Sequence, residues 1–200
     1  MSSQIDFLVE YLEIIGTVVG LIYLWLEYHA SIYLWVASIV MPLIYIFIYH
    51  DAGLYADMGI NIYYVFASIY GLICWRWGNL SKGRKDADAG LKITHTPHRH
   101  VAPLGIVSVA LIFAIAWVLI AFTDSNVPWL DSITTSLSIV AMWMMARKYV
   151  EQWWVWIVVD AISAGLYIYK ELYFTAGLYA LYAVIAYFGY KKWKELMLTQ

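Results

Sequence analysis

The sequence predicts an all-α integral membrane protein, with seven transmembrane helices arranged as two triplets on either side of a single linking helix. Hydrophobic residues make up 64% of the chain and charged residues only 13%, which lies outside the range of soluble domains. Seven apolar segments each approach the roughly 20 residues that a membrane-spanning helix needs. The first three segments also match the last three in sequence. Together these observations predict a 3+1+3 parallel pseudo-repeat.

The apolar segments follow one another through short connections, apart from one long polar break. We expect the seven helices over residues 7–27, 31–49, 53–75, 101–122, 129–146, 150–169 and 171–189. The break, residues 77–100, is rich in Lys and Gly and predicts a solvated linker rather than a domain. The chain 1–200 is therefore predicted to be a single transmembrane domain. Its parts are repeat one at about 7–76, the linker 77–100, the linking helix 101–122 and repeat two at about 129–194.

The internal repeat appears when the chain is shifted by 118 residues, which places the first triplet on the last without a gap. Tryptophan and glycine carry the match, because apolar composition alone does not reproduce them in one register. The matched pairs are Trp25 with Trp143, Trp35 with Trp153, Trp75 with Trp193, Gly59 with Gly177 and Gly71 with Gly189. Since one helix separates the triplets, both insert with the same orientation. Parallel repeats of this kind are typical of transporters that bind their ligand near the membrane midplane, between the two halves.

The two triplets differ at one position near their centre. In the repeat register, Pro42 of the second segment coincides with Asp160 of the sixth. A proline in mid-helix frees a backbone carbonyl and can kink the helix. We expect Pro42 to act either as a rocking point or as a kink with a packing role.

The distribution of Lys and Arg predicts the orientation of the chain. With the N-terminus outside and the C-terminus in the cytoplasm, every Lys and Arg except Lys170 lies on the inner side, as the positive-inside rule requires. Tryptophan and tyrosine near the ends of spans are expected to form interfacial belts. We assign Trp75, Trp129 and Trp193 to these belts.

Composition also excludes several classes of function. The net charge of −2 gives no indication of nucleic acid as a partner. The single cysteine excludes an intramolecular disulfide and a cysteine-based metal site. His95, His98 and His100 fall in the predicted linker. Histidines can bind a metal, but in a solvated, mobile segment we expect these three to bind none. No protease motif is present, and the last span lacks a lysine for a retinal Schiff base. We predict no enzyme activity and no cofactor; the alternative of another class is a seven-helix receptor or enzyme.

The sixth span carries the strongest candidate for a binding site. Trp153, Trp156, Asp160, Ser163 and Tyr167 share one face of the predicted helix. A charge at the depth of Asp160 costs at least about 2.5–3.5 kcal/mol on insertion scales, so it needs a partner or a function. This face favours the wall of a polar cavity lined with aromatic rings. The alternative is a packing face whose acid pairs with a neighbouring helix.

Other spans add polar side chains at helical spacing, but none adds an embedded Lys or Arg. The charge of an embedded acid is then offset by protonation, by polar neighbours or by a cationic ligand. Aromatic faces attract a desolvated cation by about 2 kcal/mol or more. The polar residues predict a pocket for an organic cation with a flat ring. They are Glu13 in the first span, Asp57, Asn61 and Tyr64 in the third, Thr135 in the fifth, and Thr175, Tyr179 and Tyr182 in the seventh.

The stretch from Leu130 to Ser163, LDSITTSLSIVAMWMMARKYVEQWWVWIVVDAIS, resembles the second half of the PnuC-type vitamin transporters. The segments LYAD and IYG, with the first-span EIIG, resemble their first half. The resemblance implies a fold similar to the full-length, sugar-transporting SWEET proteins. It also implies uptake of a dephosphorylated B vitamin across a bacterial inner membrane by facilitated diffusion, with a cytosolic kinase trapping the product. The expected partners are this vitamin and the lipid bilayer, and a homo-oligomer is left open.

Two positions of the resemblance bear on the substrate. The nicotinamide riboside carriers of the family show a W-x-x-W-x-x-x-N pattern in the sixth span, and in this chain Asp160 replaces the Asn. The same carriers have Gln at the position where this chain has Asn61. These departures favour thiamine, whose amine donates to a carboxylate and whose thiazolium ring stacks on Trp or Tyr. Nicotinamide riboside, also a cation, is the alternative. The predicted ligand contacts are Trp153, Trp156, Asp160, Asn61, Tyr64, Ser163, Tyr167, Asp57, Thr135, Tyr179 and Glu13.

Overall fold

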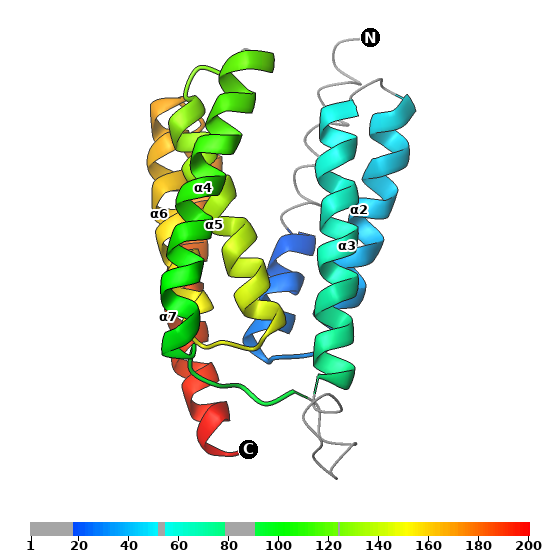
Figure 1. Cartoon of the computed structure of the whole chain (residues 1–200), viewed down its shortest axis with the longest axis vertical. Coiled ribbons are helices and arrows are strands. Elements are labelled where there is room, and N and C mark those ends of the chain that lie inside the picture. Colours follow the sequence, from blue (N-terminus) through cyan, green and yellow to red (C-terminus); the bar gives the residue numbers. More distant parts are fainter. Residues whose placement is uncertain (1–17, 52–54, 79–90, 124) are drawn as a thin grey trace. The chain divides into compact units, whose positions relative to one another are not determined.

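The computed structural model describes residues 18–51, 55–78, 91–123 and 125–200, and nearly all of them are helical (Figure 1). The prediction of an all-α membrane protein is confirmed. The chain begins its described part with a helix over Val18–Tyr28. The complete helices that follow are α2 (Tyr33–Asp51), α3 (Tyr55–Trp77), α4 (His98–Phe122), α5 (Pro128–Ala146), α6 (Gln152–Tyr169) and α7 (Tyr173–Leu198).

Two helix boundaries differ by more than two residues from those expected. Helix α4 begins at His98, inside the predicted linker, and α7 continues to Leu198, beyond the predicted end at 189. The extension of α7 is amphipathic: Trp193 is buried, whereas Lys191 and Lys194 are exposed. Loss of apolar composition therefore marks where α7 leaves the hydrocarbon region, but not where the helix ends.

The chain divides into two compact units, residues 1–69 and 70–200. In the second unit α5 packs against both α4 and α6, and α6 packs against α7. Neighbouring helices of this unit run antiparallel (Figure 1). The linking helix α4 therefore belongs to the same compact unit as the second triplet.

Helix α4 presents most of its apolar side chains outward. Ile106, Phe113 and Ile120 are all exposed, as expected for a surface in contact with lipid. Among the described helices, α4 alone is both long and apolar enough to be identified as a span by hydropathy. The other long helices carry Trp, Tyr and polar residues that lower their mean hydropathy, and these residues are the ones that matter for the site below.

The turns after three helices share one backbone geometry. Ala30, Lys148 and Glu171 each have a positive φ, near 49°, 52° and 60°. In each turn the next residue's N–H donates to a carbonyl five residues back, as in Ser31 to Leu26 and Tyr149 to Met144. Ala30 and Lys148 are also equivalent in the repeat register. The repeat found in the sequence thus extends to the backbone of the turns.

Helix α2 continues through Pro42, and the first unit contains a compensation for the hydrogen bond that proline removes. Proline has no N–H, so the carbonyl of Ser38, four residues back, loses its partner within the helix. The buried hydroxyl of Ser68, on α3, donates to this carbonyl at 3.1 Å. Ser68 thereby satisfies a polar group that a bilayer would leave unpaired.

We expect Ser68→Ala to destabilise the protein by about 1–2 kcal/mol, because the Ser38 carbonyl is left unsatisfied. In a Pro42→Ala background the restored N–H can bond to this carbonyl, so Ser68→Ala should cost much less. A double-mutant cycle on thermal unfolding in detergent measures this coupling. Equal costs of Ser68→Ala in both backgrounds would contradict the pairing.

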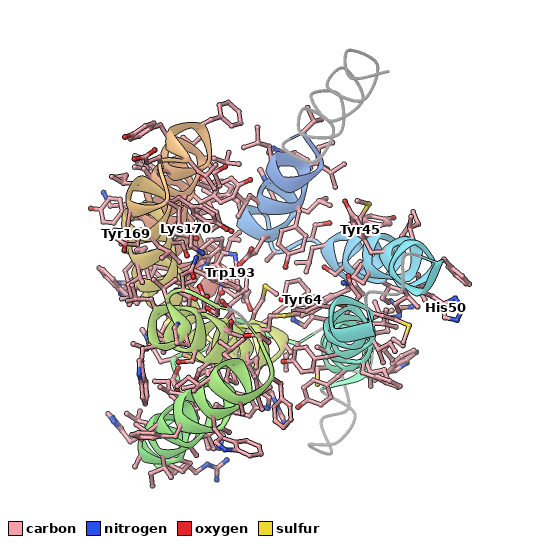
Figure 2. All side chains as sticks on the ribbon, turned by 90° about the horizontal axis from the view of Figure 1, so that it is seen from above. Tyr45, His50, Tyr64, Tyr169, Lys170 and Trp193 are labelled. Atoms are coloured by element: carbon pink, nitrogen blue, oxygen red, sulfur yellow. The ribbon has the colours of Figure 1, made fainter. Side chains whose placement is uncertain are left out.

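Three tryptophans meet in the interior of the second unit, and two of them correct the sequence analysis. Trp75 and Trp193 are 2% and 0% exposed, so their assignment to interfacial belts is wrong, whereas Trp129 is 50% exposed, as a belt requires. The ring of Trp193, labelled in Figure 2, lies 6.1 Å from that of Trp75 and 5.7 Å from that of Trp153. The Trp75 indole N–H donates to the Met145 carbonyl at 3.0 Å.

Lys148 lies over the outer ring of this cluster. Its Nζ is 4.3 Å from the centroid of the Trp75 ring, a cation–π contact. Burial lowers the pKa of Lys148 to about 8. Lys148 is also the left-handed residue of the turn between α5 and α6. Its contact with Trp75 therefore connects this turn to the tryptophan cluster.

Residues 91–97 of the predicted linker, which we call the strap, are held against the second unit, although Lys92, Thr94 and His95 are exposed. The backbone of Thr94 exchanges hydrogen bonds with Lys148 and Val150, in the α5–α6 turn, and Ile93 is buried. The N–H and hydroxyl of Thr96 and the ring of His95 all donate to the Glu151 carboxylate. The Ile93 N–H donates to the side chain of Gln200. Residues 79–90 of the linker lie outside the described residues.

The Glu151 carboxylate, at the start of α6, accepts the hydrogen bonds that hold the strap, and the strength of this attachment depends on pH. Partial burial acts to raise the pKa of Glu151, but the hydrogen bonds from His95 and Thr96 outweigh it and hold the pKa below its usual 4.5. A depressed pKa means that the stabilisation is complete above pH 4.5 and is lost as the pH falls through the lower, folded-state pKa.

We therefore expect Glu151→Gln to lower stability at pH 7 by about 1 kcal/mol, a value reduced for partial exposure, and to weaken the loss of stability toward acid pH. Thermal unfolding from pH 7 to pH 3 measures both effects. Glu195→Gln, which removes an equal charge from an exposed pair with Lys192, is the control and should change little. An unaltered acid limb in Glu151→Gln would show that this carboxylate does not hold the strap.

Candidate functional site

Asp160 lies near the middle of α6, on the side of the helix that packs within the second unit. Only 7% of the residue is exposed. Among the described residues it makes no hydrogen bond and no ion pair. A buried carboxylate without a partner is costly in any environment and more so within a bilayer. The alternative raised by the sequence, a packing face whose acid pairs with a neighbouring helix, stays open, because Asp160 faces Tyr179 and Tyr182 of α7.

Phenol groups surround this carboxylate. Tyr179 and Tyr182, one turn apart on α7, both lie close enough to Asp160 to interact with it electrostatically. Tyr179 stacks on Tyr167 of α6 with ring centroids 5.1 Å apart and an interplanar angle of 22°. The Tyr182 ring meets that of Tyr179 edge-on at 5.7 Å. The structure therefore brings three phenols and one acid together from two helices.

Ser163 and Trp156 complete the α6 side of this group. Ser163 is buried one turn after Asp160, and Trp156 is half-buried one turn before it. The indole N–H of Trp156 is buried without a hydrogen-bond acceptor among the described residues. A polar ligand beside Asp160 would supply such an acceptor.

Trp153 lies on the same face but has different surroundings. It is 0% exposed, packs edge-on against Trp193, and contacts Gly189 so closely that a Cβ there would lie 2.6 Å from its ring. Its indole N–H is also buried without an acceptor among the described residues. Trp153 therefore packs tightly between helices α6 and α7, and its indole N–H is a donor without an acceptor among the described residues.

The remaining predicted contacts are spread over the chain. Thr135 is half-buried on α5 and makes no hydrogen bond to Asp160 among the described residues. Asn61 and Tyr64 are half-buried on α3 in the first unit, where Tyr64 meets the ring of Tyr63 at 5.7 Å; Tyr64 is labelled in Figure 2. Glu13 and the side chain of Asp57 lie outside what the structure describes.

Tyr182, selected from the sequence as a pocket residue but not as a predicted ligand contact, lies in the group around Asp160. The structure adds one residue that the sequence did not single out. Glu27, in the first unit, is 2% exposed and acts electrostatically on Tyr23. Its place at the end of an apolar segment gives no indication from sequence that it is buried.

The nearest basic residue along α6 is occupied elsewhere. Lys170 is ten residues from Asp160, about 15 Å along a helix at 1.5 Å per residue. Its Nζ lies 4.0 Å from Asp131 Oδ1, at the start of α5, while the Ser125 hydroxyl donates to the other oxygen of that carboxylate. Figure 2 shows Tyr169 and Lys170 together at the edge of the second unit. Lys170 is therefore paired with Asp131 rather than with Asp160.

Comparisons with known proteins agree over almost the whole chain. Residues 10–195 match the family described as nicotinamide mononucleotide transporter. The chain is 26% identical to the nicotinamide riboside transporter PnuC of Escherichia coli (strain K12) over 207 residues, covering 92% of this chain and 84% of that protein. It is 25% identical over 191 residues to the riboflavin/roseoflavin transporter RibM of Streptomyces davaonensis, with coverage of 90% and 83%.

A solved structure matches the fold as well. The crystal structure of the vitamin B3 transporter PnuC superposes with a TM-score of 0.66 and 23% sequence identity, covering 92% of this chain and 80% of that one. At this identity the likeness establishes the fold. The resemblance seen in the sequence is thus confirmed at the level of family and of architecture.

Proposed function

The chain belongs to the nicotinamide mononucleotide transporter family, and we propose on this premise that it carries a cationic vitamin, nicotinamide riboside, across the membrane. The relatives described above are named for nicotinamide riboside or for riboflavin. They favour the alternative substrate of the sequence analysis over thiamine. We place the protein in the bacterial inner membrane, with its N-terminus outside.

The observation that carries the proposal is the unpaired carboxylate of Asp160 among Tyr167, Tyr179 and Tyr182. Nicotinamide riboside presents a flat pyridinium cation and an amide, together with sugar hydroxyls. A carboxylate offsets the positive ring, phenol rings stack on it, and phenol hydroxyls bond to the amide or the sugar. The buried indole N–H of Trp156 needs an acceptor, which the amide or the sugar provides.

The same charge argument sets the selectivity of the site. Nicotinamide mononucleotide carries an additional phosphate, whose negative charge would be repelled by Asp160 in a site of low dielectric. The dephosphorylated vitamin is therefore the preferred substrate. Phosphorylation by a cytosolic kinase would then trap it inside the cell, and transport itself needs only facilitated diffusion.

Counterflow in proteoliposomes tests this function. Labelled nicotinamide riboside should enter vesicles loaded with unlabelled riboside, without a proton or sodium gradient. Unlabelled riboside added outside the vesicles should reduce the uptake of the labelled riboside, and nicotinamide mononucleotide should reduce it much less. Thiamine and riboflavin belong in the same panel, because preference for either would replace the proposed substrate. Uptake that follows an imposed ion gradient would overturn facilitated diffusion.

A further inference from the structure

A groove between α4 and α5 is lined by none of the residues grouped around Asp160. Its volume is about 350 Å³, within the range of pockets that hold small ligands. Pro103, Leu104 and Val107 line it from α4, and Ile139, Val140 and Trp143 line it from α5. Leu104 and Val140 belong to the hydrophobic cluster beneath the groove. The lining is thus almost wholly apolar, on helices that face lipid.

One end of the groove is polar and positively charged. His100, in the first turn of α4, lines this end, and its Nδ1 lies 3.1 Å from the hydroxyl of Tyr149. The guanidinium of Arg147, an exposed residue just after α5, lies 5.5 Å from the centroid of the Trp143 ring. Arg147 stacks in the same way on Tyr70 at 5.7 Å. Among the described residues it forms no ion pair with a carboxylate.

We propose that this groove binds an anionic phospholipid, with one acyl chain between α4 and α5 and the phosphate at Arg147. An apolar groove ending at a cation on the membrane-facing surface matches a molecule with a hydrocarbon chain and an anionic head. Trp143 and Tyr70 hold the guanidinium plane at the groove's end, so less side-chain freedom is lost when a phosphate binds. Arginine also offers two parallel N–H donors to a phosphate.

A phospholipid fits these observations better than a second copy of the chain. A second copy would have to present a carboxylate to Arg147 beside an apolar ridge. Helix α4, whose apolar side chains are the most widely exposed, contains no Asp or Glu. A soluble phosphate would reach Arg147 but would leave the groove empty.

Native mass spectrometry and thermal unfolding in detergent can test the site with three probes: phosphatidylglycerol, phosphatidylcholine with the same chains, and glycerol phosphate. We expect phosphatidylglycerol to bind and to raise the unfolding temperature more than the other two.

Arg147→Gln should weaken the binding of phosphatidylglycerol on the order of fivefold, since one basic residue near a membrane surface contributes about 1 kcal/mol. Lys194→Gln is the matched control, because Lys194 has the same charge and a similar aromatic contact, with Tyr190 at 5.6 Å. Val107→Trp should block the groove and weaken binding with Arg147 intact.

Four results would overturn the proposal. Equal binding of the two phospholipids, or equal losses in Arg147→Gln and Lys194→Gln, would indicate unspecific lipid. Stabilisation by glycerol phosphate as large as by phosphatidylglycerol would indicate a phosphate site without a groove. Efficient cross-linking between two copies through cysteines placed at Val107 and Ile139, unaffected by added phosphatidylglycerol, would indicate that a second copy fills it.

Discussion

Asp160→Asn should weaken the binding of nicotinamide riboside by about tenfold. The change keeps the volume of the side chain and removes its charge. A hydrogen bond to a charged group contributes about 1.5–3 kcal/mol and a neutral one about 1 kcal/mol, so the expected loss is roughly 1–2 kcal/mol, with tenfold corresponding to 1.4 kcal/mol. Calorimetric titration of the purified protein measures it.

The reduced form of the same riboside separates charge from shape, because its dihydropyridine ring is uncharged. Asp160→Asn should leave the affinity for the reduced riboside nearly unchanged. Glu171, an exposed residue in the α6–α7 turn, is not part of the group around Asp160, so Glu171→Gln removes one negative charge and should affect neither ligand. If Asp160→Asn binds the oxidised riboside as tightly as wild type while losing thermal stability, Asp160 is a packing residue and the proposed site is wrong.

Gly189→Ala should be among the most destabilising small changes in the chain. A Cβ at this position would lie 2.6–2.7 Å from three atoms of the Trp153 ring. That ring cannot move aside, because it is fully buried and backed by Trp193. Overpacking of a dense interior costs about 1–3 kcal/mol, which exceeds the gain in helix propensity of about 1 kcal/mol for replacing Gly by Ala.

Gly177→Ala, also in α7, is the control, since nothing lies within 4 Å of a Cβ there. It should gain stability from helix propensity alone. Trp153→Phe should relieve Gly189→Ala, so that the double variant is more stable than the sum of the two single losses predicts. Thermal unfolding without ligand measures all four proteins. Gly189→Ala and Gly177→Ala with equal stability would show that the close contact is not maintained.

Periodicity predicted much of the site and missed what depends on neighbouring helices. The shared face of Trp156, Asp160 and Ser163 follows from helical spacing, and α6 is helical over all three residues; their role as ligand contacts stays a prediction. Spacing cannot show that Trp153 meets Gly189, because that contact depends on which residue of α7 comes opposite. For the same reason Trp75 and Trp193, which look like belt residues by position, lie in the interior.

The linker shows a second limit of sequence reasoning. Residues 91–97 are polar, and polar composition predicts solvation. Their order comes from partners far along the chain, at Glu151 and Gln200, and from a turn whose left-handed residue is Lys148. No local pattern indicates those pairings. The repeat, in contrast, could be predicted, because residue pairs at one constant offset report on two copies of one structure.

Trp75 has a consequence for how this architecture could be assembled from separate pieces. It is the last buried residue before the undescribed segment 79–90, and within the second unit it contacts the Met145 carbonyl, the Trp193 ring and the Lys148 ammonium. A polypeptide that ends just after Trp75 would therefore keep the side chain that contacts Met145, Trp193 and Lys148 on a second polypeptide beginning near Leu91. These three contacts could then form between two separately made chains, without a covalent link between the triplets.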